Sequence, residues 1–260
     1  MEGKNPKQKK LAQTTFAARS NLVPLTALGY ELWRKNALTL LSGRNFPLSE
    51  EYQLLLNSVQ PVHGLQFLDL GTSTGLYSRA LLLAGAEKVY ALDFSPAMLR
   101  VARRKVDRGE LPVGWGGSGK GAGTIATRSG EHSSPSPGDG SLTPEIVQKI
   151  YKGFEPLLAR AEDIPLPDES VDGVVVGGSW NEFPDPEQVV QEMYRVLRPG
   201  GRVFLMLSLH SGGPLQRVLA WSGLRFPTLE AVQGQLEDAG LRTRGWRDGL
   251  VGFVTGTKVK

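Results

Sequence analysis

The chain has 260 residues, 40% of them hydrophobic, and a formal net charge of +4 at pH 7. This length suits one large α/β domain with appendages, and the absence of cysteine excludes disulfides, thiolate catalysis and cysteine-ligated metals. The first ten residues carry +3 of the charge, so the charge is weak evidence for a nucleic-acid-binding face. No apolar run is long enough for a membrane span, and we expect no metal site.

The N-terminal part predicts a basic tail followed by helices. Residues 1–15 are rich in lysine and poor in large apolar side chains, so we expect them to be disordered. Residues 16–60 predict a helical cap, in which Ser49 precedes two acidic residues as an N-cap would. The basic N-terminus lacks the apolar core of a secretory signal. We therefore expect a cytoplasmic protein, with a transit peptide as the alternative.

From residue 61 onward, buried strands alternate with helices. The pattern predicts an irregular segment at 211–227, and a flexible insertion at about 109–140 because that stretch is rich in Gly, Ser and Pro. Ser95 and Pro96 are typical of a helix start, as is Thr143 before Pro144. The predicted strands are 65–70, 88–93, 154–159, 170–178, 202–209, 241–248 and 250–258, and the predicted helices are 75–86, 95–108, 144–152, 185–197 and 228–240.

This alternation predicts a parallel sheet that is covered by helices on both faces. Asp248-Gly249 joins the last two strands and is typical of a tight turn. We therefore expect the sheet to end in an antiparallel hairpin, which a plain dinucleotide-binding fold does not have.

A glycine turn follows the first strand, in "FLDLGTSTGLYSRAL". Gly71 and Gly75 let the backbone approach a ligand, and the following helix start offers free N–H groups. The spacing does not fit the G-x-G-x-x-G fingerprint of NAD-binding proteins. An ordinary turn without a ligand remains the alternative.

Two acidic residues end the first two strands. Asp93 can accept hydrogen bonds from a ribose diol, while Asp69 would repel a pyrophosphate but could accept from an ammonium group. A ligand with an adenosine ribose and a cationic amino-acid end is S-adenosylmethionine (SAM). The turn and the two acids together favour SAM over NAD.

Four segments resemble class I SAM-dependent methyltransferases, in the branch of ubiquinone/menaquinone-biosynthesis and other small-molecule methyltransferases. They are "FLDLGTSTG", "VYALDFSPAML", "AEDIPLPDESVDGVVV" and "FPDPEQVVQEMYRVLRPGGRVFLM". The resemblance extends from about Val59 to Thr257, apart from the insertion. It implies an α/β, Rossmann-like fold with a seven-stranded, mostly parallel sheet of order 3-2-1-4-5-7-6, in which strand 7 is antiparallel. The methyltransferase domain would span 61–260.

The resemblance also implies a set of cofactor-binding residues. Asp69 and the turn from Gly71 to Gly75 would hold the methionine end, and Asp93 would hold the ribose. Phe94 and Met98 would pack near the adenine. The full predicted set is Asp69, Gly71, Thr72, Ser73, Gly75, Asp93, Phe94, Met98, Ala161, Glu162, Gly177 and Gly178.

The chain departs from the family pattern at one of these positions and at a residue next to them. Ser73 stands where the family often has glycine, and Arg160 stands where many relatives have an acid that reads the adenine amino group. Arginine cannot accept a hydrogen bond. Glu162 or Asp163 would then read the adenine, or the backbone alone would.

Methyl transfer requires that the acceptor atom is aligned with the methyl group of SAM and that water is excluded. It requires a base only where the acceptor loses a proton. Glu182 and His210 are the candidate catalytic groups, each with an ordinary solvated or structural role as the alternative. Core packing is likewise the alternative for Tyr30 and Trp33 on the N-terminal helical segment. The predicted substrate-binding residues are Tyr30, Trp33, Trp180, Asn181 and Trp221.

We therefore expect a SAM-dependent methyltransferase that acts on a small, aromatic or apolar acceptor. The segment "GGSWNEF" does not match the Asn/Asp-Pro-Pro-aromatic motif of some amino-group methyltransferases, so O- or C-methylation is favoured over N-methylation. An RNA methyltransferase and a non-catalytic SAM-binding protein are the alternatives. The sequence leaves the acceptor and the oligomeric state open.

Overall fold

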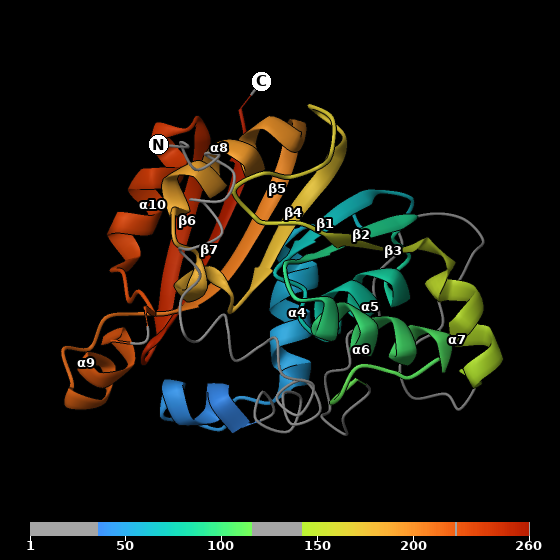
Figure 1. Ribbon diagram of the computed structural model, residues 1–260, viewed down its shortest axis with the longest axis horizontal. Coiled ribbons are helices and arrows are strands. Elements are labelled where there is room, and N and C mark those ends of the chain that lie inside the picture. The colour runs from blue at the N-terminus through green and yellow to red at the C-terminus, as the bar shows by residue number, and fades with distance from the viewer. Residues whose placement is uncertain (1–35, 116–141, 222, 260) are drawn as a thin grey trace, which may run out of the picture.

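A computed structural model describes residues 36–115, 142–221 and 223–259 of the chain. These residues form one sheet between two layers of helices (Figure 1). Its strands are β1 (Gln66–Leu70), β2 (Lys88–Asp93), β3 (Phe154–Leu158), β4 (Val171–Gly177), β5 (Leu197–Ser208), β6 (Leu241–Asp248) and β7 (Val251–Lys258). Its α-helices are α4 (Leu48–Ser58), α5 (Leu76–Leu83), α6 (Pro96–Asp107), α7 (Pro144–Ile150), α8 (Pro186–Val196), α9 (Pro214–Trp221) and α10 (Leu229–Asp238). Short 3-10 helices are η1 (Tyr151–Gly153) and η2 (Trp180–Glu182), and a further helical stretch covers 36–42.

The strand order is β3-β2-β1-β4-β5-β7-β6, which confirms the predicted topology. The first five strands are parallel, and β7 runs antiparallel to both β5 and β6. Gly249 has a φ of +56° in the turn between β6 and β7. The predicted hairpin at the end of the sheet is thus confirmed.

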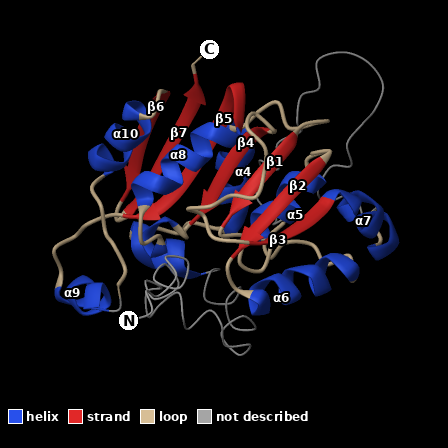
Figure 2. Ribbon diagram, turned by 45° about the horizontal axis from the view of Figure 1, so that its top comes forward, coloured by secondary structure: helices blue, strands red, loops and turns tan. Residues whose placement is uncertain are grey.

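Alternate residues of each central strand enter two separate cores. In β1, Phe67 packs with residues of α4 and α5, whereas Leu68 packs with residues of α8 and α10. This period of two is expected for a sheet that is buried on both faces. Figure 2 shows the helices on either side of the strands. The central strands are therefore held rigidly, and their carboxyl ends share one edge.

Several helix starts follow the sequence signals. The Ser95 hydroxyl accepts from the Met98 N–H at 3.3 Å, with Pro96 as the first helical residue, and Thr143 caps α7 in the same way. The expected cap at Ser49 is wrong. Helix α4 starts one residue earlier, at Leu48, and its N-cap Pro47 has no side chain that could accept a hydrogen bond.

The segment 211–227 is not wholly irregular, as the sequence had indicated, because it contains α9. This helix stands apart from the sheet and its covering helices in both views (Figures 1 and 2). Three of its apolar side chains, those of Val218, Leu219 and Trp221, are exposed. Gly212 and Gly213 precede the helix and Gly223 follows it, and glycines are typical of loops, which explains the irregular interpretation.

The predicted insertion at 109–140 begins with packed residues. The buried Arg79 donates from Nη1 to the carbonyls of Glu110 and Leu111, and the Tyr52 hydroxyl donates to the Val113 carbonyl at 2.9 Å. The rest of the insertion, the tail at 1–15 and the predicted substrate contacts Tyr30 and Trp33 lie outside the described residues. The predicted domain boundaries stay predictions.

Two strands form the edges of the sheet. Among the described strands, β3 pairs only with β2, and β6 pairs only with β7. β3 has Pro156 at its centre, and β6 carries Arg242, Arg244 and Arg247. None of the helices in the described part of the chain has the length and apolar character needed to cross a bilayer.

Candidate functional site

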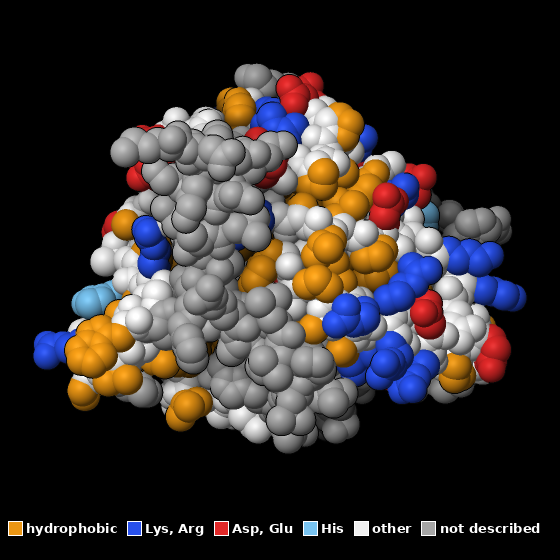
Figure 3. All heavy atoms as spheres, in the orientation of Figure 1, with side chains coloured by type: hydrophobic (Ala, Val, Ile, Leu, Met, Phe, Trp, Pro, Cys, Tyr) orange, Lys and Arg blue, Asp and Glu red, His pale blue; other side chains and the backbone are white. Residues whose placement is uncertain are grey.

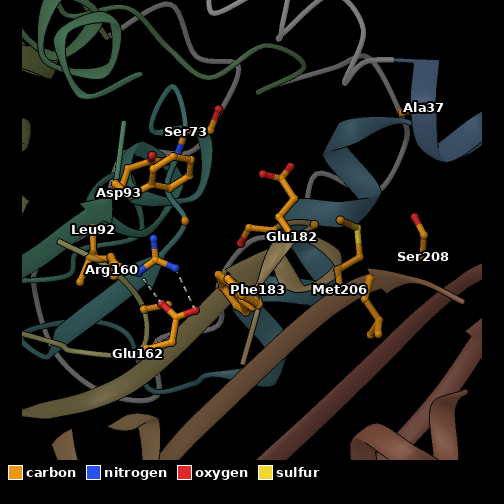
Figure 4. A pocket seen from close by; sticks show the side chains of 18 of the residues that line it. Ala37, Ser73, Leu92, Asp93, Arg160, Glu162, Glu182, Phe183, Met206 and Ser208 are labelled. Carbon is orange, nitrogen blue, oxygen red and sulfur yellow. Dashed lines mark hydrogen bonds and ion pairs between the residues drawn. The ribbon is translucent and has the colours of Figure 1, made fainter. Parts of the chain in front are cut away.

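A cleft opens at the carboxyl ends of the central strands (Figure 4). We call its first part the cofactor half; it is lined by Gly71, Ser73, Leu92, Asp93, Phe94, Ala159, Arg160, Ala161 and Glu162. We call its second part the apolar half; it is lined by Ala37, Leu38, Leu41, Phe183, Pro184, Met206, Leu207 and Val251, together with Glu182 and Ser208. Gly177, Gly178 and Ser179, which end and follow β4, lie between the halves.

The glycine turn after β1 lies tightly against the segment that follows β4. Gly71 has a φ of +73°, and a Cβ atom added there would lie 2.3 Å from the Ser179 Oγ. The N–H groups of Gly71 and Thr72 both donate to the Leu92 carbonyl at 2.9 Å, which ties the turn to the end of β2. Only glycine fits this position without strain.

Asp93 links the glycine turn to the start of α6. Its Oδ2 accepts from the Ser73 N–H and its Oδ1 accepts from the Ser95 N–H, each at 2.8 Å. Ser73 has a φ of +53°, which is uncommon for a residue with a side chain, and its bond to Asp93 holds it there. Each carboxylate oxygen has a further lone pair, so Asp93 can still accept from a ligand in the cleft.

Asp69 lies beneath the turn and does not line the cleft. Its Oδ2 accepts from the Thr72 hydroxyl at 2.6 Å, the Ser78 N–H at 3.0 Å and the Ser78 hydroxyl at 2.7 Å. Its exposed fraction is 2%. In this structure, Asp69 therefore supports the turn and the first residues of α5 rather than facing the cavity.

Burial dominates the electrostatics of both carboxylates. Desolvation raises the pKa of Asp69 to about 6, although the hydrogen bonds from Thr72 and Ser78 act in the opposite direction. Desolvation also raises the pKa of Asp93 to about 6, and the nearby charge of Asp69 adds to the shift. Both groups lose charge as the pH falls through this range.

Affinity for a ligand that donates hydrogen bonds to Asp93 is expected to fall at low pH. A protonated Asp93 has one acceptor oxygen fewer and no negative charge. We expect SAM affinity to fall about tenfold for each pH unit below about 6. Calorimetric titration at pH 7.5 and pH 5 measures this, and equal affinities at both values would contradict it.

The structure brings nine of the predicted residues together in the cleft. These are Gly71, Ser73, Asp93, Phe94, Ala161, Glu162, Gly177, Gly178 and Glu182. Figure 4 shows the Glu182 side chain in the space between Ser73 and Asp93 on one side and Ala37 on the other.

Three predicted cofactor residues besides Asp69 lie next to the cleft rather than in its lining. Thr72 points to Asp69, and Gly75 is the left-handed residue that starts α5, with a φ of +78°. Met98 is buried, with its Sδ 3.5 Å from the Ser73 Oγ. These residues can shape the cofactor half through the turn that they support.

The predicted substrate contacts Trp180 and Asn181 are buried outside the cleft lining. Trp180 packs edge-on against Phe183, with ring centroids 6.0 Å apart, and so supports a residue of the apolar half. The Asn181 side chain donates to the Ser208 carbonyl and accepts from the Ser208 N–H at 2.9 Å. Trp221 is 92% exposed on α9, and His210 is exposed beyond the end of β5. Neither of them lines the cleft.

Arg160 enters the cofactor half as part of an ion pair. Its Nε lies 3.3 Å from the Glu162 Oε2, and Figure 4 shows the two side chains facing each other. Asp163 is exposed and does not line the cleft. Of the two acids considered for adenine recognition, only Glu162 therefore faces the cavity, and its carboxylate is shared with Arg160.

Sequence reasoning missed most of the apolar half. The stretch 36–42 reaches the cleft because the Leu41 carbonyl accepts from the Leu250 N–H in the β6–β7 turn at 2.9 Å. Arg44 and Asp248 form an ion pair beside this contact. The sequence signal was weak, because Arg44 and Asp248 are 204 positions apart in the chain and carry no motif.

Comparison with known proteins identifies the class of this fold. Two family models, both described as a methyltransferase domain, match residues 67–116 and 141–205. A methyltransferase of Thermotoga maritima, titled as a possible histamine N-methyltransferase, superimposes with a TM-score of 0.57 over 91% of this chain and 98% of that chain, at 17% identity. That likeness concerns the fold alone. The structure is a Rossmann-like, class I methyltransferase fold.

Curated relatives agree with this class. The chain is 30% identical to a demethylmenaquinone methyltransferase of Clavibacter sepedonicus over 57% of this chain and 43% of that protein. It is 26% identical to the chloroplastic 2-methyl-6-phytyl-1,4-hydroquinone methyltransferase 1 of Oryza sativa over 69% of this chain and 42% of that protein. The match thus spans less than half of each relative. The chain carries a class I SAM-dependent methyltransferase domain, and SAM is its cofactor.

The residues of the cofactor half fit SAM. The turn at Gly71 is a cradle that a Cβ atom would fill, and Asp93 offers free lone pairs for hydroxyl groups. Phe94, Leu92 and Ala161 provide apolar surface for a flat ring. A ligand with a ribose and an aromatic base requires such hydrogen-bond acceptors and such an apolar surface.

Proposed function

We propose that this protein transfers a methyl group from SAM to a small-molecule acceptor, with oxygen or carbon as the methylated atom. The observation that carries the proposal is the single cleft in which the cofactor half and the apolar half are continuous. Bound SAM supplies a methyl group on a positively charged sulfur. The chain must hold the acceptor next to this group and keep water out.

The apolar half suits an acceptor with an apolar or aromatic body. Its lining includes Leu38, Leu41, Phe183, Met206 and Val251, with few polar groups among them. Apolar walls bind such a body by removing both surfaces from water. The names of the two relatives point to a quinone or hydroquinone ring as the acceptor class.

Within this proposal, Glu182 is the base that takes a proton from the acceptor. For O-methylation, a hydroquinone or phenol hydroxyl must lose its proton as the oxygen takes the methyl group. For C-methylation, loss of the same proton activates the ring, and the hydrogen on the methylated carbon then moves as a proton to the oxygen, which restores the aromatic ring. Glu182 is the acidic residue that the cleft places beside the apolar half, on η2. The cofactor half contains two acidic residues, Asp93 and Glu162, and Glu162 forms an ion pair with Arg160.

Substitution of Glu182 by glutamine is expected to reduce kcat by at least about 100-fold, because general base catalysis typically contributes that much. The affinity for SAM should stay the same. Glu187→Gln on α8 is the matched control, since Glu187 is exposed and does not line the cleft. An unchanged kcat in the Glu182 variant would show that Glu182 is not the base.

The methyl transfer itself is tested with SAM carrying a labelled methyl group. The protein is incubated with a panel of hydroquinones, phenols, amines and RNA, and the label is located by chromatography and mass spectrometry. Label on oxygen or carbon of a ring compound is the expected result. Label on nitrogen or RNA would refute the proposed acceptor class, and SAM binding without any transfer would indicate a non-catalytic protein.

A further inference from the structure

Helix α9 presents apolar side chains to solvent. Trp221 is 92% exposed, Val218 62% and Leu219 37%. Hydrophobic side chains gather over α9 at the lower left of Figure 3, away from the helices that cover the sheet. Exposure of one apolar residue is ordinary, but a tryptophan and two aliphatic residues within four positions of one helix form a local apolar surface.

The structure fixes α9 beside the mouth of the cleft. In the first turn of the helix, the Gln216 side chain donates to the Leu209 carbonyl and accepts from the Ser211 N–H, both at 2.7 Å. After the helix, the Arg225 N–H donates to the Asn181 carbonyl at 2.9 Å. Leu209 follows the cleft residue Ser208, and Asn181 precedes the cleft residue Glu182. The apolar surface is therefore anchored at both ends to the cleft rim.

The chain segment that contains α9 carries formal charges of one sign. The sequence contains no aspartate or glutamate between Glu192 and Glu230. Arg217 lies on α9 and Arg225 follows it, and both are exposed. Arginine side chains beside an exposed tryptophan are typical of helices that lie in the interface of a bilayer with anionic lipids.

We propose that α9 docks on the surface of an anionic lipid bilayer. Val218 and Trp221 enter the headgroup region, and Arg217 and Arg225 contact lipid phosphates. Leu40, 83% exposed on the stretch that lines the apolar half, adds a second apolar contact from the cleft rim. This docking goes beyond methyl transfer, and its test measures binding only.

The test is flotation of the full chain with vesicles of phosphatidylcholine, with and without phosphatidylglycerol. We expect binding to the anionic vesicles, weakened by high salt. The double substitution Val218→Ser and Trp221→Ser should lower the partition coefficient by at least about tenfold, since binding scales with buried apolar area. Arg217→Gln and Arg225→Gln should each lower it about fivefold.

The matched control is Ile146→Ser, which removes a 41%-exposed apolar residue from α7, at the end of the molecule opposite α9 (Figure 1). It should bind as the parent does, and all variants should keep the parent's melting temperature and SAM affinity. The proposal is overturned if the parent does not float, or if the double variant floats equally, as it would with binding through the N-terminal lysines. A parent dimer that the Trp221 change dissociates would assign α9 to a second copy instead.

Discussion

Replacement of Asp93 by asparagine is expected to weaken SAM binding by about tenfold to a hundredfold. Hydrogen bonds to a charged acceptor contribute about 1.5–3 kcal/mol, and asparagine keeps only one acceptor oxygen. In the present structure both oxygens of Asp93 already accept backbone N–H groups, so the variant also loosens Ser73 or Ser95. Isothermal titration with SAM measures the effect.

The same variant is expected to change how stability depends on pH. The folded-state pKa of Asp93 is about 6, above the ordinary value of 3.8, so the folded state binds the proton more tightly than the unfolded state. The parent therefore loses stability as the pH rises from about 4 to about 6. Relative to the parent, the variant should therefore be about 2 kcal/mol more stable toward unfolding at pH 7 than at pH 4.

Asp163→Asn is the control for both measurements, because Asp163 is exposed and does not line the cleft. Its SAM affinity and its pH profile should match those of the parent. If Asp93→Asn binds SAM as the parent does, the ribose is not held by Asp93. If its stability difference is the same at pH 4 and pH 7, burial does not raise the pKa of Asp93.

Substitution of Gly71 by alanine should both destabilise the fold and abolish tight SAM binding. The left-handed backbone at φ +73° costs about 1 kcal/mol for alanine. The added Cβ would also lie 2.5 Å from the Ser179 Cβ, which cannot move without the backbone, and such overpacking costs about 1–3 kcal/mol. We expect a total loss of about 2–4 kcal/mol in urea unfolding.

Gly43→Ala separates the two contributions. Gly43 has the same φ of +73°, but nothing lies within 4 Å of the position that its Cβ would take. This control should lose only about 1 kcal/mol of stability and keep its SAM affinity. Equal losses in the two variants would show that the contact with Ser179 is not what restricts position 71 to glycine.

Local signals predicted the cofactor half of the cleft well. The predicted strand at 88–93 has the bounds of β2, and Ser95 caps α6 as expected. These features depend on short-range rules, namely burial of an apolar strand and satisfaction of free N–H groups at a helix start. Gly71 directly follows β1, and Asp93 is the last residue of β2. The prediction of these two strands therefore also placed both residues at one edge of the sheet.

The apolar half was beyond the reach of the sequence because its residues come from distant segments. Leu41 and Val251 meet only because the stretch 36–42 packs against the β6–β7 turn. The position of Asp69 was also not predictable in detail. The carboxylate of an aspartate at the end of a strand can face a ligand or turn inward. In this structure the hydroxyls of Thr72 and Ser78 donate to Asp69 and hold its carboxylate in the inward position.

The two edges of the sheet bear on how the protein resists aggregation. An edge strand exposes unpaired N–H and C=O groups, to which a strand of another molecule can add. Pro156 in β3 has no N–H to offer at its edge, and three arginines in β6 would repel a like strand at the other. Both edges of the described sheet therefore disfavour the addition of a strand from another molecule, even though the central strands are strongly apolar.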